Sequence, residues 1–396
     1  MNMNEQMKES EESILHTYNR FPVVFEKGQG CYLYDSEGKE YLDFAAGIAV
    51  NSLGYHYPGY DEALKDQIDK LMHISNLYYN EPIIEAGAKL VKASKMSKAF
   101  FTNSGTEAIE GALKAAKKYA YVRDGHADHE IIAMNHSFHG RSIGALSVTG
   151  TAHYREPFEP LMGGVKFADF NNLESVKAQI TDKTCAIITE VVQGEGGIYP
   201  AKKEFLEGLR QICDEKDIML IFDEIQCGMG RTGYYFAWQA YGVQPDIMTS
   251  AKALGCGVPV GAFVLGEKAA KASLEPGDHG TTYGGNPFVC AAVSKVFDIY
   301  ENDKIIEHVQ EMTPYLEQKL DEIVAKHECA ATRRGMGFMQ GIVIQGRSVG
   351  EVVKAALAKG LLVISAGSDV LRIVPPLVIT KEHIDKMVAI LDECME

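Results

Sequence analysis

The sequence predicts an α/β protein with two domains: a large one with a mostly parallel central sheet sandwiched by helices, and a smaller α+β one built from both termini. Three observations support this prediction. Strand-length apolar runs alternate with amphipathic helical segments through most of the chain, which is the pattern of a parallel sheet covered on both faces. This alternation stops after residue 287, where a long helical stretch begins and short strands and helices follow it. The length of 396 residues also exceeds what one hydrophobic core usually serves.

The large domain is expected over residues 51–287. Its strands coincide with short apolar runs and its helices with the amphipathic stretches between them. Strands are predicted at residues 99–102, 131–134, 185–192, 218–222, 247–250 and 261–265, and helices at residues 106–122 and 204–215.

The small domain is expected over residues 288–396, together with an N-terminal segment, residues 1–50, that packs with it. The N-terminal segment holds an antiparallel pair of strands, residues 32–35 and 41–44, around a turn at Gly38. The C-terminal part is predicted to contain a long helical stretch at 288–326, strands at 341–344, 361–365 and 370–374, and helices at 352–359 and 382–394.

Composition excludes several classes of partner. The formal net charge of −15 argues against nucleic acid and anionic membrane surfaces, so an anionic substrate must meet a local cluster of Arg or Lys. The 8 cysteines form no CxxC pair, which suits reduced thiols, and no metal site is expected. The polar, Glu-rich start has no signal-peptide pattern, and no apolar run approaches the ~18 residues of a membrane span. We therefore expect a cytoplasmic protein.

Two charged residues follow buried strands and carry the most information. Lys252 comes two positions after the strand at 247–250, and Asp223 comes directly after the strand at 218–222. Side chains at the carboxyl ends of parallel strands face the ligand site of an open α/β sheet. Taken alone, such an Asp is as often a helix cap or a member of a buried ion pair.

Two further motifs follow strands. Ser104-Gly105-Thr106-Glu107 opens a helix, where free N–H groups attract an anion, although the same letters form an ordinary capping box. Phe138-His139-Gly140-Arg141 offers an aromatic face for a flat ring and a guanidinium for a carboxylate. Taken in isolation, this second motif is better explained by a core aromatic and a solvated Arg.

Three more stretches combine polar groups with glycine or apolar surroundings. Glu190-Val191-Val192-Gln193-Gly194-Glu195-Gly196-Gly197 ends a strand in a flexible loop, which is also typical of a plain connection. The hydroxyls and glycines of residues 279–287 suit a phosphate or a polar surface loop. Arg372 lies within an apolar strand, so it is either paired in the core or directed at an anionic ligand.

One cofactor, pyridoxal phosphate, accounts for the amine, the acid, the ring site and the anion site together. In this order the motifs resemble the class III (ornithine-type) aminotransferases of the fold type I pyridoxal-phosphate enzymes. The resemblance covers nearly the whole chain and includes residues 18–22, 51–55 and 75–79. Two departures are Ile109, where relatives often carry Asn, and Val191-Val192, where Pro-Ile or Pro-Val is common.

The resemblance implies a role for each residue around the cofactor ring. Lys252 is expected to form the Schiff base, and Asp223 to pair with the pyridine nitrogen. Gln226 is expected to bond the ring hydroxyl. Phe138 would stack on one face of the ring, with Ile225 beneath the other.

The resemblance also implies how the phosphate and the substrates are held. Gly105 and Thr106 would hold the phosphate, with Thr282 reaching it from the neighbouring subunit of a homodimer with shared active sites. The remaining residues would contact the substrates: Arg141 and Arg372 bind carboxylates, Glu195 pairs with Arg372 when the substrate does not need it, and Tyr18 is a further substrate contact.

The implied reaction is a ping-pong transfer of the terminal amino group of N2-acetylornithine to 2-oxoglutarate. It yields N-acetylglutamate 5-semialdehyde and glutamate, a step of arginine synthesis. Ornithine is the alternative donor, and succinylornithine, succinyl-diaminopimelate and 4-aminobutyrate are others. Two readings from other classes stay open at this point: a related lyase or aminomutase, and a binding protein without turnover on the same fold.

Overall fold

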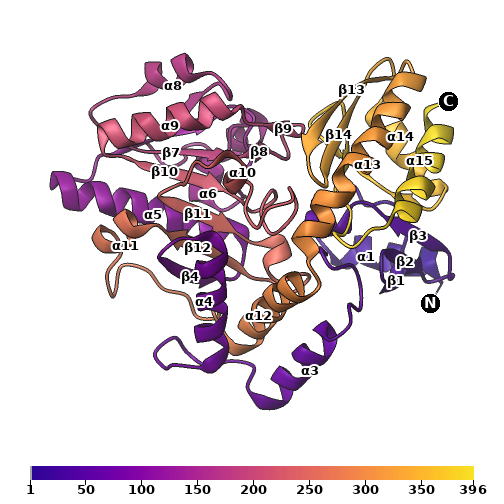
Figure 1. The fold of residues 1–396 in the computed structure, drawn as a ribbon, viewed down its shortest axis with the longest axis horizontal. Helices are drawn as coiled ribbons and strands as arrows, with labels where there is room; N and C mark the ends of the chain where they lie inside the picture. The colour runs from indigo at the N-terminus through magenta and orange to yellow at the C-terminus, as the bar shows by residue number, and fades with distance from the viewer. Residues whose placement is uncertain (1) are drawn as a thin grey trace.

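The computed structural model describes residues 2–396. Its larger part is built on a seven-stranded sheet with the strand order β4-β12-β11-β10-β7-β5-β6 (Figure 1). All neighbours pair in parallel except β12, which is antiparallel to both β11 and β4. The strands are β4 (Lys98–Thr102), β5 (Glu130–Met134), β6 (Val165–Ala168), β7 (Thr184–Glu190), β10 (Met219–Asp223), β11 (Ile247–Ser250) and β12 (Gly261–Leu265). The predicted fold class is confirmed; the edge strand β6 was not predicted.

Both faces of this sheet are buried, and β10 shows it residue by residue. Met219 and Ile221 belong to the hydrophobic cluster under α5, while Leu220 and Phe222 belong to the cluster that includes α9. Side chains alternate across a strand, so a continuous apolar run is possible only where helices cover both faces. This is the physical reason that the strands read as unbroken apolar runs.

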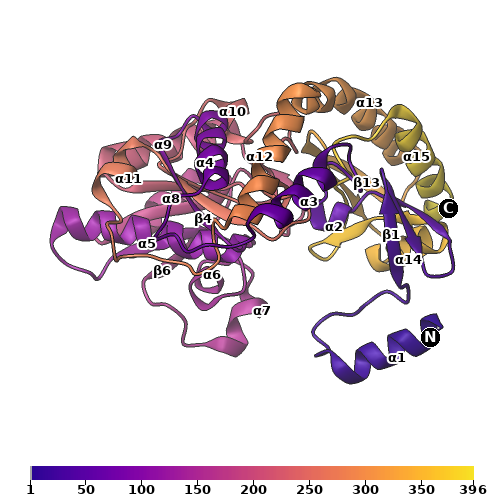
Figure 2. The same cartoon turned by 90° about the horizontal axis from the view of Figure 1, so that it is seen from below.

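Helices surround the sheet on both sides (Figures 1 and 2). Two of them are long: α5 follows β4, and α12 packs on α4. The helices between residues 46 and 302 are α2 (Ala46–Ala49), α3 (Tyr60–Lys70), α4 (Glu81–Ser94), α5 (Gly105–Asp124), α6 (Ile143–Ser147), α7 (Ala152–Arg155), α8 (Leu173–Gln179), α9 (Lys203–Lys216), α10 (Trp238–Tyr241), α11 (Glu267–Ala272) and α12 (Pro287–Asn302). Single 3₁₀ turns follow α7 at Glu156–Phe158 and β11 at Lys252–Leu254.

The remainder of the chain forms two four-stranded sheets, β13-β14-β17-β16 and β1-β2-β3-β15, with three helices beside them. A two-stranded ribbon, β8 (Val192–Gln193) with β9 (Tyr199–Pro200), lies next to β13. The other elements are β1 (Phe25–Gln29), β2 (Tyr32–Asp35), β3 (Glu40–Asp43), α13 (Ile305–Lys326), β13 (Ala330–Met336), β14 (Met339–Ile344), α14 (Val349–Ala358), β15 (Leu361–Leu362), β16 (Ile364–Ala366), β17 (Val370–Ile373) and α15 (Lys381–Met395).

Strand β15 joins the two ends of the chain. It pairs in parallel with β3, with Leu361 opposite Leu42. The N-terminal strands therefore complete their sheet with a strand from the C-terminal part. Helix α1 (Met3–Ser13) has no buried residue and stands apart from the main body in Figure 2.

Two sequence predictions were wrong in detail. The helical stretch at 288–326 is two helices, because the chain turns at Asp303 and Lys304, where Lys304 takes a left-handed φ of 53°. The strand at 361–365 is also two strands in different sheets, β15 and β16. A short apolar run does not reveal such a change of sheet, because both pieces are buried in the same way.

The described residues contain no helix that combines the length and apolar character required to cross a bilayer. Over the same range every cysteine is free, and all but Cys329 are buried. The site residues meet at one edge of the large sheet: β7 ends at Glu190, β10 ends at Asp223, Lys252 follows β11, and α5 begins just after β4. This edge collects the carboxyl ends of the parallel strands, where ligands bind in open α/β sheets.

Candidate active site

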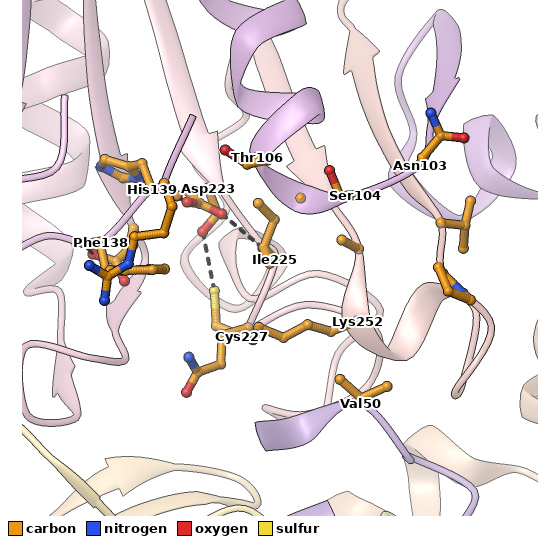
Figure 3. Close-up of a pocket in the computed structure, with 18 of the residues that line it drawn as sticks. Val50, Asn103, Ser104, Thr106, Phe138, His139, Asp223, Ile225, Cys227 and Lys252 are labelled. Carbon is orange, nitrogen blue, oxygen red and sulfur yellow. Dashed lines mark hydrogen bonds and ion pairs between the residues drawn. The ribbon is translucent and has the colours of Figure 1, made fainter. Parts of the chain in front are cut away.

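A cavity of about 510 Å³ opens at this edge of the sheet. It brings together residues from six separate segments of the chain (Figure 3). The predicted site residues that line it are Gly105, Thr106, Phe138, Arg141, Asp223, Ile225, Gln226 and Lys252.

Lys252 stands at the start of the 3₁₀ turn after β11, with a left-handed φ of 50°. Left-handed backbone in a residue other than glycine costs about 1–3 kcal/mol, and such strain concentrates at functional sites. Burial lowers the pKa of the Lys252 amine; the nearby Glu195 carboxylate opposes this shift, and the Arg372 guanidinium adds to it. Within residues 2–396 the amine has no hydrogen-bond or ion-pair partner, so it is free to react.

Asp223 is 3% exposed and is held from several sides. Its Oδ2 lies 2.7 Å from His139 Nδ1, and its Oδ1 accepts hydrogen bonds from Ile225 N at 3.0 Å and Thr249 Oγ1 at 3.2 Å. These contacts fix the orientation of the carboxylate. His139 Nε2 is buried and has no partner in the described chain.

The start of α5 forms an anion cradle. Ser104 Oγ accepts a hydrogen bond from Glu107 N at 3.3 Å, whereas the Glu107 side chain turns to Asn103 N at 2.7 Å, so only half of the capping box forms. The first N–H groups of a helix have no partner within it. Those of Gly105 and Thr106 therefore remain available to an anion beside the cavity.

A side chain at position 105 would press against Ile225. A Cβ there would lie 2.9 Å from Ile225 Cδ1 and 3.4 Å from Ala251 Cβ. The missing side chain lets the helix start lie directly against Ile225, which forms one wall of the cavity.

Arg372, on β17, pairs with Glu195. Its Nη1 lies 2.5 Å from Glu195 Oε1, its Nη2 lies 3.3 Å from Oε2, and Nη1 also donates to Gln226 Oε1 at 3.1 Å. Arg372 is 3% exposed, so its charge is compensated almost entirely by this pair. Gln226 lines the cavity, which places the pair at its edge.

Arg141 is exposed and has no carboxylate partner in the described part of the chain. Its guanidinium lies over the ring of Tyr154, 3.9 Å from the centroid, and Tyr154 meets Phe138 edge-on at 6.0 Å. Stacking leaves the N–H groups at the edge of the guanidinium free for a carboxylate. Tyr154 comes from α7, and no local pattern in the sequence links it to Arg141.

Glu190 is the second buried acid at the end of a strand. It lies opposite Asp223 in the register of β7 and β10 and accepts hydrogen bonds from Gly194 N at 3.1 Å and Phe138 N at 3.4 Å. Burial, and then the charge of Asp223, raises the pKa of Glu190 well above its ordinary value. Glu190 follows an apolar run directly, as Asp223 does. No role of its own was predicted for Glu190 from the sequence, although this shared pattern could have marked it as a site residue.

Four predicted site residues do not line the cavity of this chain: Glu195 and Arg372 form the pair at its edge, and Tyr18 and Thr282 lie outside it. Tyr18 is 73% exposed, and Thr282 is exposed beside Thr281, whose Oγ1 accepts a hydrogen bond from Asn103 Nδ2 at 3.3 Å.

The described residues also include one group at metal-ligand distance outside the cavity, Asp124 with His126 and His129. Both carboxylate oxygens of Asp124 accept hydrogen bonds from Arg123, each at 2.6 Å.

A reactive lysine and an oriented carboxylate beside an anion-binding helix start define the site of a pyridoxal-phosphate enzyme. The family model for class-III aminotransferases matches residues 14–395, and the chain belongs to that family. Its cofactor is pyridoxal 5′-phosphate.

Relatives agree over nearly the whole length. The acetylornithine aminotransferase of Clostridium acetobutylicum is 47% identical over 98% of this chain and 100% of its own. The succinylornithine transaminase of Yersinia pseudotuberculosis is 43% identical over 96% of this chain and 94% of its own. The solved structure of ornithine aminotransferase from Toxoplasma gondii matches with a TM-score of 0.95 and 28% identity, covering 100% of this chain and 95% of that one.

The residues present fit this cofactor. Gly105 and Thr106 line the cavity at the start of α5, where free N–H groups suit a phosphate, and the oriented Asp223 carboxylate suits a protonated ring nitrogen. Lys252 has a free amine beside the cavity. The site therefore offers partners for the phosphate, the ring nitrogen and the aldehyde carbon of the cofactor.

The stacking of Arg141 on Tyr154 gives a test. Tyr154→Ala is expected to raise the apparent KM for a carboxylate substrate about two- to fivefold with kcat largely kept, because an exposed cation–π contact is worth about 0.5–1 kcal/mol. Tyr154→Phe keeps the ring face and should behave like the unmodified enzyme. Steady-state kinetics checks this; equal KM values for all three proteins would contradict the contact's role.

Proposed function

We propose that this aminotransferase moves the terminal amino group of N2-acetylornithine to 2-oxoglutarate, giving N-acetylglutamate 5-semialdehyde and glutamate. Relatives that carry the acetylornithine name over nearly the full length support the donor assignment. The observation that carries the proposal is the unequal state of the two arginines: Arg141 is free, whereas Arg372 is covered by Glu195. 2-Oxoglutarate has two carboxylates and N2-acetylornithine has one. The reaction therefore needs two carboxylate sites, and one of them must be closed while N2-acetylornithine is bound.

When bound, the cofactor supplies the electron sink that makes a proton on the amine-bearing carbon acidic. Lys252 would hold the cofactor through its side-chain amine, and the same amine would act as general base and acid at that carbon. Its lowered pKa increases the share of neutral amine at working pH. Asp223, oriented by His139 and Thr249, holds the proton on the ring nitrogen.

The two arginines are proposed to bind the carboxylates of the two substrates in different combinations. The single carboxylate of N2-acetylornithine binds Arg141, and Arg372 stays paired with Glu195, so no buried cation is left uncompensated. 2-Oxoglutarate carries two carboxylates. Its distal carboxylate binds Arg141, and its α-carboxylate displaces Glu195 from Arg372.

Further roles rest on the positions of the remaining residues. Gly105 and Thr106 hold the phosphate, Phe138 and Ile225 lie on the two ring faces, and Gln226 bonds the ring hydroxyl. The proposed substrate contact of Tyr18 requires the N-terminal segment to reach a site outside the cavity of its own chain.

A homodimer with shared active sites is part of the proposal. The segment at 71–84 is packed beside the segment at 282–288, through Asn76 Nδ2 to Gly284 O at 2.8 Å and Phe288 N to Met72 O at 3.3 Å. Both segments expose large apolar side chains, and Thr282 lies on the same surface. A contiguous apolar patch of this kind marks a protein interface. The exposed residues are Leu71, Met72, Leu77, Tyr78, Tyr79, Ile84 and Tyr283.

We also propose that residues 51–287 form the cofactor-binding domain, and that residues 288–396 form the small domain with residues 1–50. The pairing of β15 with β3 supports this division. A cytoplasmic location is proposed from the free, mostly buried cysteines of the described chain.

The role of Lys252 is tested by replacement. Lys252→Ala is expected to reduce turnover by about 10²–10⁴-fold or more, because it removes both the covalent anchor and the proton carrier. Hydride reduction of the unmodified holoenzyme followed by peptide mapping should place the label on Lys252. Multiple turnover by the variant, or a label on another residue, would reject the assignment.

The donor is tested with a panel of amines at fixed 2-oxoglutarate. N2-Acetylornithine should exceed ornithine in kcat/KM by about tenfold or more, because the free α-ammonium of ornithine must give up its hydration on binding, whereas N2-acetylornithine presents a neutral amide. Succinylornithine, succinyl-diaminopimelate and 4-aminobutyrate complete the panel. A higher kcat/KM for ornithine would transfer the assignment to that substrate.

Shared sites are tested by mixing two impaired variants. In a mixed dimer of Lys252→Ala and Thr282→Ala chains, one of the two sites has both residues intact, so equal mixing should restore up to about a quarter of full activity. The measurement is activity after dissociation and reassociation. Each variant treated in the same way by itself is the control, and no recovery in the mixture would contradict the shared site.

A further inference from the structure

The loop that carries Glu195 is held by a second arginine. Arg334, on β13, donates from Nε to Gly197 O at 2.7 Å, and its guanidinium lies over the ring of Tyr199, 3.6 Å from the centroid. Among residues 2–396, no carboxylate lies within ion-pair distance of Arg334. Its charge is therefore compensated by a carbonyl and an aromatic face, and both of these belong to the Glu195 loop.

The packing leaves no room between the loop and the sheet. Gly197 has a φ of 114°, and a Cβ there would lie 2.9 Å from Arg334 Nη2, 3.2 Å from Tyr199 Cε2 and 3.4 Å from Val370 Cγ2. A backbone hydrogen bond also holds this loop at Glu195, whose carbonyl oxygen accepts from Gly367 N at 2.9 Å.

Both partners of the Glu195–Arg372 pair depend on one sheet. Arg372 lies on β17, and Arg334 lies on β13, in the sheet β13-β14-β17-β16. The backbone of the Glu195 loop is thus fixed to the sheet that carries Arg372. Glu195 can uncover Arg372 by turning its side chain while its backbone stays in place.

We propose that Arg334 is a positioning residue for substrate choice. With Tyr199, it fixes residues 195–197 so that Glu195 covers Arg372 whenever no α-carboxylate competes for that arginine. This proposal rests on the proposed function, in which the pair is closed for N2-acetylornithine and open for 2-oxoglutarate.

Loss of the anchor has opposite effects on the two substrates. A loosened Glu195 leaves Arg372 uncompensated more of the time, and that cation disfavours a donor that brings its own ammonium to Lys252. The same uncovered arginine is ready for the α-carboxylate of 2-oxoglutarate. In a ping-pong reaction, kcat/KM for each substrate reports its own half-reaction, so the ratio of the two values measures the bias.

The experiment measures this ratio for the holoenzyme and its variants. Arg334→Ala and Tyr199→Ala are each expected to shift the ratio of kcat/KM for N2-acetylornithine to that for 2-oxoglutarate by about tenfold toward 2-oxoglutarate. Tyr199→Phe keeps the ring and should retain the original ratio. Arg334→Lys keeps a donor for Gly197 O but loses the planar stack, so an intermediate ratio is expected.

Arg333→Ala is the matched control. Arg333 is the neighbour of Arg334 on β13, but its side chain pairs with Asp321, from Nε to Oδ1 at 2.7 Å, and not with the Glu195 loop. The Arg333→Ala substitution removes one positive charge from the same strand as Arg334→Ala. It should leave the ratio of the two kcat/KM values unchanged. Thermal unfolding of each variant identifies any protein that fails to fold, in which case Tyr199→Ala carries the test.

Glu195→Ala separates the two possible failures. If Glu195→Ala shifts the ratio but Arg334→Ala and Tyr199→Ala do not, the anchor proposal is overturned and the switch stands. If Glu195→Ala leaves the ratio unchanged, the switch in the proposed function fails and the anchor proposal fails with it. Equal losses in both kcat/KM values for Arg334→Ala would also overturn the anchor, because they indicate general damage.

Discussion

The site depends on the parallel pairing of β10 with β11. This pairing places Asp223 opposite Thr249 and brings Lys252 to the same edge of the sheet as the carboxylate. Asp223 is buried and Lys252 is half-buried, and a charge removed from water costs free energy unless it is paired. The two residues meet this cost in different ways. Asp223 accepts hydrogen bonds from several donors. Lys252 has no partner in the described chain, and burial lowers the pKa of its amine, so the amine loses its proton more easily.

The neighbouring acids show how burial divides similar groups between different tasks. Asp223 and Glu190 end adjacent strands at the same level, yet Glu190 takes only backbone N–H donors and its pKa is raised. A raised pKa of Glu190 reduces the repulsion between the two neighbouring carboxyl groups. Glu195 is different again, because it is only half-buried and pairs with the Arg372 guanidinium. The three acids are thus held by different partners: Asp223 by side-chain and backbone donors, Glu190 by backbone N–H groups, and Glu195 by an arginine.

Much of the fold was predictable from local patterns. The strands of the large sheet are buried on both faces, so their apolar runs are continuous, and the residues at their carboxyl ends follow directly. Asp223, Lys252 and Gly105 were found in this way, and the structure places them around one cavity. The contacts of His139, Tyr154 and Arg334 were not predictable, because each partner comes from a distant segment. The turn at Lys304 and the division at residue 363 were missed because short breaks in buried segments leave no change in composition.

The pairing of β15 with β3 has a consequence for biosynthesis. During translation β1, β2 and β3 leave the ribosome long before their last partner strand is made, so the outer edge of β3 stays open for most of synthesis. Open strand edges are templates for unwanted association. The sheet that begins with β1 therefore cannot be completed until the residues of β15, 361–362, have been made.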